Sequence, residues 1–241
     1  MGTYVLVHGA GHGGWCWRKV VEILRREGHQ VEAPDLPGHG EDKTPISQVT
    51  LKAYADRVCQ VLDTQAEPVV LVGHSMGGIV ISQAAEYRSD RIKTLVYLTA
   101  ALLPDGQSLL QGLQGGSGTL EDALAGRDLT LSGDRTYATY ADAVIRERFY
   151  GDCSDEDVAW AKSRLTRQAV EPLAAPVRTT RENFGRIPRV YIECLLDKAI
   201  PASAQKQMYT AIPCERVLSM NTSHSPFLSA PKELAGHLAS L

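Results

Sequence analysis

Short, continuous runs of apolar residues alternate with amphipathic helical patterns along most of this chain of 241 residues. The first run, TYVLVH at 3–8, lacks polar alternation, which is typical of a strand buried on both faces of a parallel sheet. Further strands of this kind are predicted at 30–35, 68–73, 92–99, 188–195 and 216–220. Helical patterns separate most of them. The alternation predicts an α/β fold with a mostly parallel six-stranded sheet and helices on both faces.

Residues 104–187 interrupt this alternation and are too long to be an ordinary crossover between neighbouring strands. They contain a loop rich in glycine and polar residues and two helical patterns, predicted at 105–118, 138–149 and 154–167. We interpret the segment as a cap, or lid, inserted after the fourth strand and lying over one edge of the sheet. The core is then formed by residues 1–103 and 188–241.

The strand at 68–73 runs directly into Gly73-His74-Ser75-Met76-Gly77, which fits the pattern G-x-S-x-G. Where this pattern joins a strand to a helix, the turn is sharp and the small flanking residues leave the serine hydroxyl standing above the sheet. The N-terminus of the departing helix also favours the negative charge that develops during acyl transfer. Ser75 is therefore predicted to be a catalytic nucleophile rather than part of a plain glycine turn.

A serine hydroxyl is a weak nucleophile that needs a base, and the base needs an acid to orient it. In this architecture the chain order is Ser, then Asp or Glu, then His, each at the end of a different strand. Asp197 follows the strand at 188–195 and His224 follows the last strand, so both are predicted to complete a catalytic triad. Asp105, after the fourth strand, stays open as an alternative acid. Glu193 is disfavoured because it lies within its strand.

The first strand ends in a glycine loop at 9–14, GAGHGG, which also fits the dinucleotide-binding pattern G-x-G-x-x-G with Asp35 as the ribose acid. That interpretation leaves the order of serine, acid and histidine unexplained, and the Tyr-x-x-x-Lys pair of the short-chain reductases is absent. We instead expect the loop to form part of an oxyanion hole, since acyl transfer needs two backbone N–H groups that converge on the developing charge. The predicted donors are Ala10 and Met76. Asp35 is then expected to cap the turn at 37–40.

Composition limits the other classes of function. A formal net charge of −3 provides no basic footprint for nucleic acid or an anionic membrane. Five cysteines form no C-x-x-C pair, and their odd number argues against a disulfide framework. No apolar stretch reaches the ~18 residues of a membrane span and a strand begins at Thr3, so we expect a cytoplasmic protein without a signal peptide. We expect no metal and no cofactor, because a glycine loop does not present His8 and His12 rigidly as ligands.

Several longer motifs, which together cover nearly the full length of the chain, are specific in combination. They are HGAGHGGWCW at 8–17, APDLPGHG at 33–40, GHSMGG at 73–78, FYGDCSDEDVAWAKSRL at 149–165, YIECLLDKAIP at 191–201 and SHSPFLSAP at 223–231. With these motifs the chain resembles the α/β-hydrolase superfamily, and more narrowly its branch of plant methylesterases and α-hydroxynitrile lyases. Bacterial pyrethroid-type carboxylesterases are also similar. The resemblance implies the α/β-hydrolase fold.

Two positions distinguish the esterases of this branch from the lyases. The cyanogenic lyases carry a Thr at the position of Ala10 and a Lys directly after the catalytic His, where this chain has Ser225. Another lyase type has Asn at the first of these positions. The resemblance thus implies a serine carboxylesterase that hydrolyses small methyl, alkyl or aryl esters through an acyl-enzyme at Ser75. A lyase that breaks C–C bonds and a small-molecule receptor with slow hydrolase activity stay as alternatives.

Residues of the cap and of the strand ends are expected to line the substrate pocket. The candidate wall residues are Leu103, Phe149, Tyr150, Trp160 and Phe227. Dimerisation is common in the branch, so a homodimer is one expectation, although no interface is visible in the sequence. The expected binding partner is a small-molecule ester, with no nucleic acid and no membrane.

Overall fold

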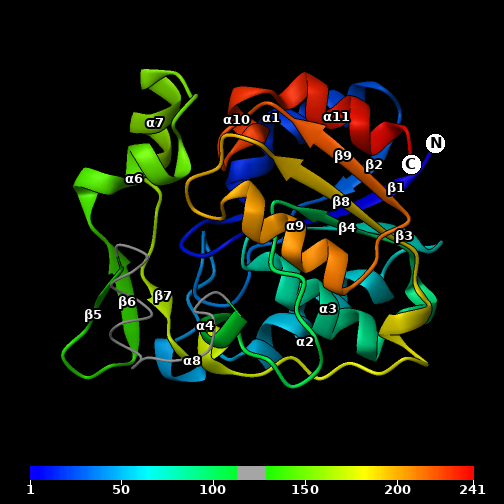
Figure 1. Ribbon diagram of the computed structural model, residues 1–241, viewed down its shortest axis with the longest axis horizontal. Helices are drawn as coiled ribbons and strands as arrows, with labels where there is room; N and C mark the ends of the chain where they lie inside the picture. The colour runs from blue at the N-terminus through cyan, green and yellow to red at the C-terminus, as the bar shows by residue number, and fades with distance from the viewer. Residues whose placement is uncertain (113–128) are drawn as a thin grey trace.

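The computed structural model describes residues 1–112 and 129–241, which contain one large sheet of six parallel strands (Figure 1). In space the strands follow the order β2-β1-β3-β4-β8-β9. Their bounds are β1 Thr3–Val7, β2 Gln30–Glu32, β3 Val69–His74, β4 Ile92–Leu98, β8 Arg189–Cys194 and β9 Arg216–Met220. The predicted six-stranded, mostly parallel sheet is confirmed.

Helices cover both faces of this sheet (Figure 1). One face is covered by α1 Arg18–Arg26, α10 Pro226–Ser229 and α11 Pro231–Ala239, and the other by α2 Leu51–Asp63, α3 Gly77–Tyr87 and α9 Ala202–Ala211. Within β1, Val5 and Val7 pack on the side of α2 and α3, whereas Tyr4 and Leu6 pack on the side of α1 and α11. This follows from the alternation of side chains along a strand. None of the helices in the described ranges combines the length and apolarity needed to cross a bilayer.

The order of the strands reverses beside β1. The chain first places β2 on one side of β1 and then returns through α2 to β3 on the other side. In an open α/β sheet, such a reversal creates a crevice at the carboxyl ends of the two central strands. The residues that follow β1 and β3, the glycine loop and Ser75, lie at this crevice.

Residues 104–187 leave the core after β4 and return before β8. Their described part contains a small antiparallel sheet in the order β5-β6-β7 together with short helices. The elements are α4 Leu109–Gly112, β5 Leu129–Leu131, β6 Tyr137–Tyr140, α6 Asp142–Phe149, α7 Asp155–Lys162, β7 Gln168–Ala169 and α8 Glu171–Ala174. In Figure 1 the small sheet, α6 and α7 lie on the side toward which the arrows of β8 and β9 point. The interpretation of the segment as a cap stays a prediction.

Four predicted segments differ from the structure by more than one residue. The helix predicted at 138–149 is wrong in its first part, because Tyr137–Tyr140 forms β6 and pairs with β5 and β7. Tyrosine and threonine favour strands, and one of the two pairing partners, β7, lies too far along the chain to be visible in a local pattern. The next helix ends at Lys162 instead of residue 167, and the strand predicted at 30–35 ends at Glu32. The loop predicted at 105–118 contains α4, and its remainder from residue 113 lies outside the described residues.

Candidate active site

Ser75 lies on the sharp turn that joins β3 to α3 and has a φ of +54°. This left-handed conformation costs on the order of 1–3 kcal/mol in a residue other than glycine and persists only where surrounding contacts enforce it. The Ser75 carbonyl oxygen accepts hydrogen bonds from Gly78 N at 3.1 Å and from Ala101 N at 3.0 Å. A Cβ atom on Gly78 would lie 2.3 Å from the Ala101 carbonyl oxygen, so only glycine fits there. The turn presents Ser75, which is partly exposed, to a cavity.

His224 and Asp197, which follow β9 and β8, are hydrogen-bonded to each other. His224 Nδ1 lies 2.6 Å from Asp197 Oδ2, and both side chains are almost completely buried. Because a carboxylate only accepts hydrogen bonds, Nδ1 carries the proton and Nε2 keeps the lone pair that a general base needs. The ring of His74, the residue before Ser75, has its centroid 4.6 Å from that of His224. The structure thus brings the ends of β3, β8 and β9 together.

The Asp197 carboxylate accepts four hydrogen bonds. Its Oδ1 accepts from the backbone N–H groups of Ala199 at 2.6 Å and Ile200 at 2.9 Å. Its Oδ2 accepts from His224 Nδ1 and also from the hydroxyl of Thr99 at 2.5 Å. A buried charge is tolerated only when its hydrogen-bonding capacity is used in this way. The four donors orient the carboxylate so that Oδ2 faces the histidine ring.

The other candidate acids lie away from this cluster. Asp105 is exposed and accepts a hydrogen bond from Thr179 N at 2.9 Å. Glu193 accepts hydrogen bonds from the hydroxyls of Ser219 at 2.7 Å and Tyr209 at 3.2 Å. Neither carboxylate contacts a histidine of the site, so the geometry favours Asp197 as the partner of the base.

His74 holds the backbone of the loop that carries His224. Its Nε2 lies 2.8 Å from the His224 carbonyl oxygen and therefore donates the hydrogen bond. Burial, together with the neighbouring rings of His224 and His12, holds the pKa of His74 well below its ordinary value. His74 is thus a neutral donor that fixes the position of His224 without adding charge beside it.

Two hydrogen bonds to the carbonyl oxygen fix the peptide group between Gly9 and Ala10 in the glycine loop after β1. The Gly9 carbonyl oxygen accepts hydrogen bonds from His8 Nδ1 at 2.9 Å and from His12 N at 3.3 Å. His8 Nδ1 is the donor, because its Nε2 accepts from Leu36 N at 3.1 Å. Burial lowers the pKa of His8 to about 4, so this arrangement of protons persists at neutral pH. Since C=O and N–H of a trans peptide point in opposite directions, the Ala10 N–H points away from these partners.

Ala10 and Met76 both line the cavity beside Ser75. Within residues 1–112 and 129–241, the backbone N–H groups of these two residues donate to no protein acceptor. A Cβ atom on Gly9 would lie 2.9 Å from Ser75 Cβ, so the absence of a side chain lets the glycine loop lie directly against the serine turn. Both N–H groups are therefore available to a negatively charged oxygen next to Ser75.

The next peptide group, between Ala10 and Gly11, is fixed by His12 and by Gln168 of the inserted segment. His12 Nδ1 donates to the Ala10 carbonyl oxygen at 2.8 Å, and Gly11 N donates to Gln168 Oε1 at 3.2 Å. The Tyr150 hydroxyl donates to His12 Nε2 at 2.7 Å. Burial lowers the pKa of His12 to about 3, so the ring stays neutral and keeps this accepting nitrogen. Residues of 104–187 thus take part in shaping the loop that carries Ala10.

The Asp35 carboxylate accepts hydrogen bonds from two backbone N–H groups of the protein. Its Oδ1 accepts from Gly14 N at 2.7 Å, and its Oδ2 accepts from Glu41 N at 2.9 Å. It therefore ties the glycine loop to the turn at 37–40, which agrees with the expected capping role. The dinucleotide interpretation loses its ribose-binding acid.

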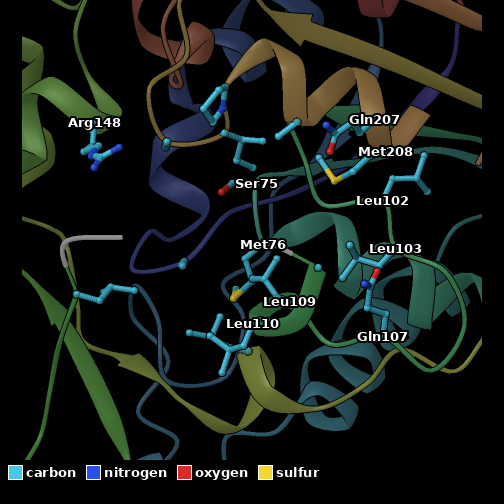
Figure 2. A pocket seen from close by; sticks show the side chains of 18 of the residues that line it. Ser75, Met76, Leu102, Leu103, Gln107, Leu109, Leu110, Arg148, Gln207 and Met208 are labelled. Carbon is cyan, nitrogen blue, oxygen red and sulfur yellow. The ribbon is translucent and has the colours of Figure 1, made fainter. Parts of the chain in front are cut away.

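A cavity of about 490 Å³ extends on both sides of Ser75 (Figure 2). Its wall is mostly apolar, and part of it comes from the segment after β4, from α4 and from α9. Figure 2 shows this part of the wall, which includes Leu102, Leu103, Leu109, Leu110 and Met208. Polar side chains also contribute, among them the exposed Gln207 and Lys198. An apolar interior with a few polar groups is typical of a site for a small, largely apolar molecule.

Residues 4–237 match the sequence profile described as the Alpha/beta hydrolase family. The chain belongs to this family. The structure of this α/β hydrolase is similar to the crystal structure of a novel pyrethroid hydrolase from Sphingobium faniae JZ-2, with a TM-score of 0.88. The two share 31% identity over 99% of this chain and 96% of the other. The resemblance inferred from the motifs is confirmed.

Sequence relatives of this α/β hydrolase have different names. It is 34% identical to a pyrethroid hydrolase of Sphingobium wenxiniae, over 98% of this chain and 85% of the relative. It is 32% identical to an alpha-hydroxynitrile lyase of Arabidopsis thaliana, over 99% of this chain and 96% of the relative. It is also 32% identical to the putative chloroplastic methylesterase 15 of the same plant, over 96% of this chain. The chain spans 54–61% of the length of this and two further putative chloroplastic methylesterases.

Two of the five predicted wall residues of this hydrolase line the cavity, namely Leu103 and Phe149. The other three, Tyr150, Trp160 and Phe227, are not part of its lining. Tyr150 is fully buried and donates to His12, and Phe227 is buried with its ring 4.9 Å from that of His74. Trp160 lies under the guanidinium groups of two arginines. These three aromatic residues stabilise the surroundings of the site by packing.

Two buried polar contacts of the site were missed by sequence reasoning. Gln168 bonds the glycine loop and Thr99 bonds the Asp197 carboxylate. A position directly after a strand is a weak signal for Thr99, and Gln168 had none, because its partner Gly11 lies 157 residues away along the chain. Both depend on which segments lie side by side in the folded hydrolase.

Proposed function

We propose that this α/β hydrolase is a serine carboxylesterase that hydrolyses small carboxylic esters through an acyl-enzyme at Ser75. One observation carries the proposal: a strained serine turn, a His224–Asp197 pair and two available N–H groups, of Ala10 and Met76, converge at one edge of the sheet. Nucleophile, base, orienting acid and oxyanion donors are the parts that acyl transfer requires.

In the proposed first step, His224 Nε2 takes the proton of Ser75 Oγ while Oγ attacks the ester carbonyl carbon. The carbonyl oxygen becomes negatively charged and accepts hydrogen bonds from Ala10 N and Met76 N. The bond to the alcohol oxygen then breaks, and His224 returns the proton to the leaving alcohol. A water molecule, deprotonated by His224, attacks the acyl-enzyme and releases the acid. Asp197 holds the tautomer of His224 and stabilises its charged form.

The cavity supports substrates with an apolar group next to the ester. Its volume of about 490 Å³ lies within the usual range of small-molecule sites, roughly 300–1,000 Å³. Relatives named methylesterases and pyrethroid hydrolases make both methyl esters and bulkier aryl or alkyl esters candidates. We propose the class of small carboxylic esters and leave the acyl and alcohol parts to a substrate panel.

Cyanohydrin cleavage is the second candidate, because one relative is named an alpha-hydroxynitrile lyase. Two residues favour the esterase. Ala10 has no hydroxyl to bind the cyanohydrin, and Ser225, directly after His224, is a fully buried neutral residue that provides no cation for a leaving cyanide. Release of cyanide from mandelonitrile at a rate comparable to ester hydrolysis would favour the lyase. A receptor would hydrolyse its ligand at most a few times per molecule.

The proposal is tested by labelling and turnover together. A fluorophosphonate probe should label Ser75, as located by peptide mass spectrometry, and should stop the hydrolysis of p-nitrophenyl butyrate. The Ser75→Ala variant should be neither labelled nor active, and its unchanged melting temperature would show that it folds. Full esterase activity after complete labelling, or in Ser75→Ala, would contradict the assignment. A parallel panel of methyl and p-nitrophenyl esters then ranks the substrates.

A further inference from the structure

Thr99 combines a strained backbone with a contact to the charged group of the site. It directly follows β4, is fully buried and has a φ of +36°. Positive φ is unusual for any residue with a side chain and most unusual for a β-branched one such as threonine. Such strain persists only where the surroundings enforce it, and it is concentrated at functional sites. Nothing in the proposed mechanism has yet used this residue.

The strained conformation places the Thr99 hydroxyl on the acid. Thr99 Oγ1 lies 2.5 Å from Asp197 Oδ2, the same oxygen that accepts from His224 Nδ1. The hydroxyl must be the donor when the carboxylate is charged. The backbone of Thr99 is fixed as well, since Thr99 N donates to the Ile192 carbonyl oxygen of β8 at 2.8 Å.

Thr99 differs from the other three donors to the Asp197 carboxylate in the segment of the chain on which it lies. Ala199 N and Ile200 N lie on the same loop as Asp197 and move with it. His224 is the group to be positioned. Among the described residues, Thr99 is the donor that joins the carboxylate to a different strand of the central sheet, β4, which pairs with β8.

We propose that Thr99 is a positioning residue of the hydrolytic reaction, whose hydroxyl fixes Asp197 Oδ2 against His224 Nδ1. The proposal rests on the esterase mechanism above. When His224 accepts the proton of Ser75, the charge on its ring is stabilised by Oδ2, so the direction of this oxygen matters most in the transition state. Loss of the hydroxyl leaves Oδ2 with one partner and lets the carboxylate turn about its Oδ1 contacts.

The test compares a substitution of equal size that removes the hydroxyl with a smaller one that keeps it. Thr99→Val keeps the β-branched shape and removes the donor, whereas Thr99→Ser keeps the donor. Since a hydrogen bond to a charged group contributes about ten- to hundredfold in an equilibrium or rate, kcat for p-nitrophenyl butyrate should fall by that factor in Thr99→Val. KM should stay within about twofold, and Thr99→Ser should recover most of kcat. Thr94→Val, at a buried threonine of β4, the strand that directly precedes Thr99, serves as the matched control.

A double-mutant cycle shows whether Thr99 acts through Asp197. In an Asp197→Asn background, Thr99→Val should change the residual kcat by less than about threefold, because neighbouring groups of one network are not additive. Equal losses in both backgrounds, or equal kcat values of Thr99→Val and Thr99→Ser, would overturn the proposal. If Thr99→Val does not fold, Thr99→Ala takes its place in the same cycle. A normal kcat in Asp197→Asn alone would instead refute the proposed mechanism.

Discussion

His8 offers a sharp test of how the backbone forms the proposed oxyanion hole. Its Nδ1 donates to the Gly9 carbonyl oxygen at 2.9 Å, and its Nε2 accepts from Leu36 N at 3.1 Å. Asparagine places an amide near the position of Nδ1, whereas glutamine places one near Nε2. His8→Asn therefore keeps a donor for Gly9 and leaves Leu36 N unpaired, and His8→Gln does the reverse.

The two variants should differ more in activity than in stability. His8→Asn leaves Leu36 N without its partner, which costs about 1–3 kcal/mol, whereas His8→Gln removes one of two hydrogen bonds to the Gly9 carbonyl oxygen, which costs about 0.5–1.5 kcal/mol. For a chain of this size each kcal/mol lowers the melting temperature by roughly 2–4 °C. His8→Gln also frees the Gly9 carbonyl from its shorter hydrogen bond, so the Ala10 N–H is no longer aimed into the cavity. Loss of one oxyanion donor costs about 10²–10³ in kcat, and the remaining bond from His12 N should reduce this to about 10–100-fold.

The assay measures kcat and KM for p-nitrophenyl butyrate and the melting temperature of the same samples. We expect His8→Asn to keep kcat within about threefold of the unsubstituted protein and His8→Gln to fall well below it. Equal kcat losses in the two variants, at similar melting temperatures, would refute the reasoning that the Gly9 carbonyl contact orients the Ala10 N–H. Greater loss in His8→Asn would indicate that the Leu36 contact is the important one.

Three further predictions concern the acid, pH and the cavity. Asp197→Asn should lower kcat by about three to four orders of magnitude because the wrong tautomer of the histidine is held, whereas Asp105→Asn, at an exposed position, should change kcat by less than twofold. Burial lowers the pKa values of His8 and His12 to about 4 and about 3, below those of the unfolded chain. Below pH 6.5 the unfolded chain therefore binds more protons than the folded protein. As the pH falls from 6.5 to 4, the free energy of unfolding should decrease by about 1.4 kcal/mol per histidine for each pH unit. A melting temperature that does not decline over this range would contradict the prediction. Met208→Trp should fill part of the cavity and raise KM for bulky esters, whereas KM for methyl esters should change by less than about twofold. Equal changes of KM for the two classes of ester would indicate that the substrate binds elsewhere.

Much of the core could be predicted from the chain alone. Continuous apolar runs and helical spacing are local properties, and they located the six strands and the helices between them. The order of Ser75, Asp197 and His224 after three of these strands was sufficient to place them at one edge, because the carboxyl ends of parallel strands meet there. The structure then places Asp197 and His224 in direct contact, and it brings the ring of His74, the residue before Ser75, to a centroid distance of 4.6 Å from that of His224.

Other features of the site were decided by the tertiary structure. Residues 138–140 carry a helical pattern but form a strand, since pairing with β5 and β7 satisfies their backbone groups better than the local helix would. Tyr150, Trp160 and Phe227 have the character of pocket residues but do not line the cavity. Gln168 and Thr99 form hydrogen bonds with the loops of Gly11 and Asp197, which are distant in sequence. Periodicity reports how one element faces its surroundings, whereas hydrogen-bond partners and cavity walls are set by contacts between segments. For this protein the sequence alone predicted the type of site and its principal residues, because strand ends are local features, and only the folded chain decided which side chains contact them.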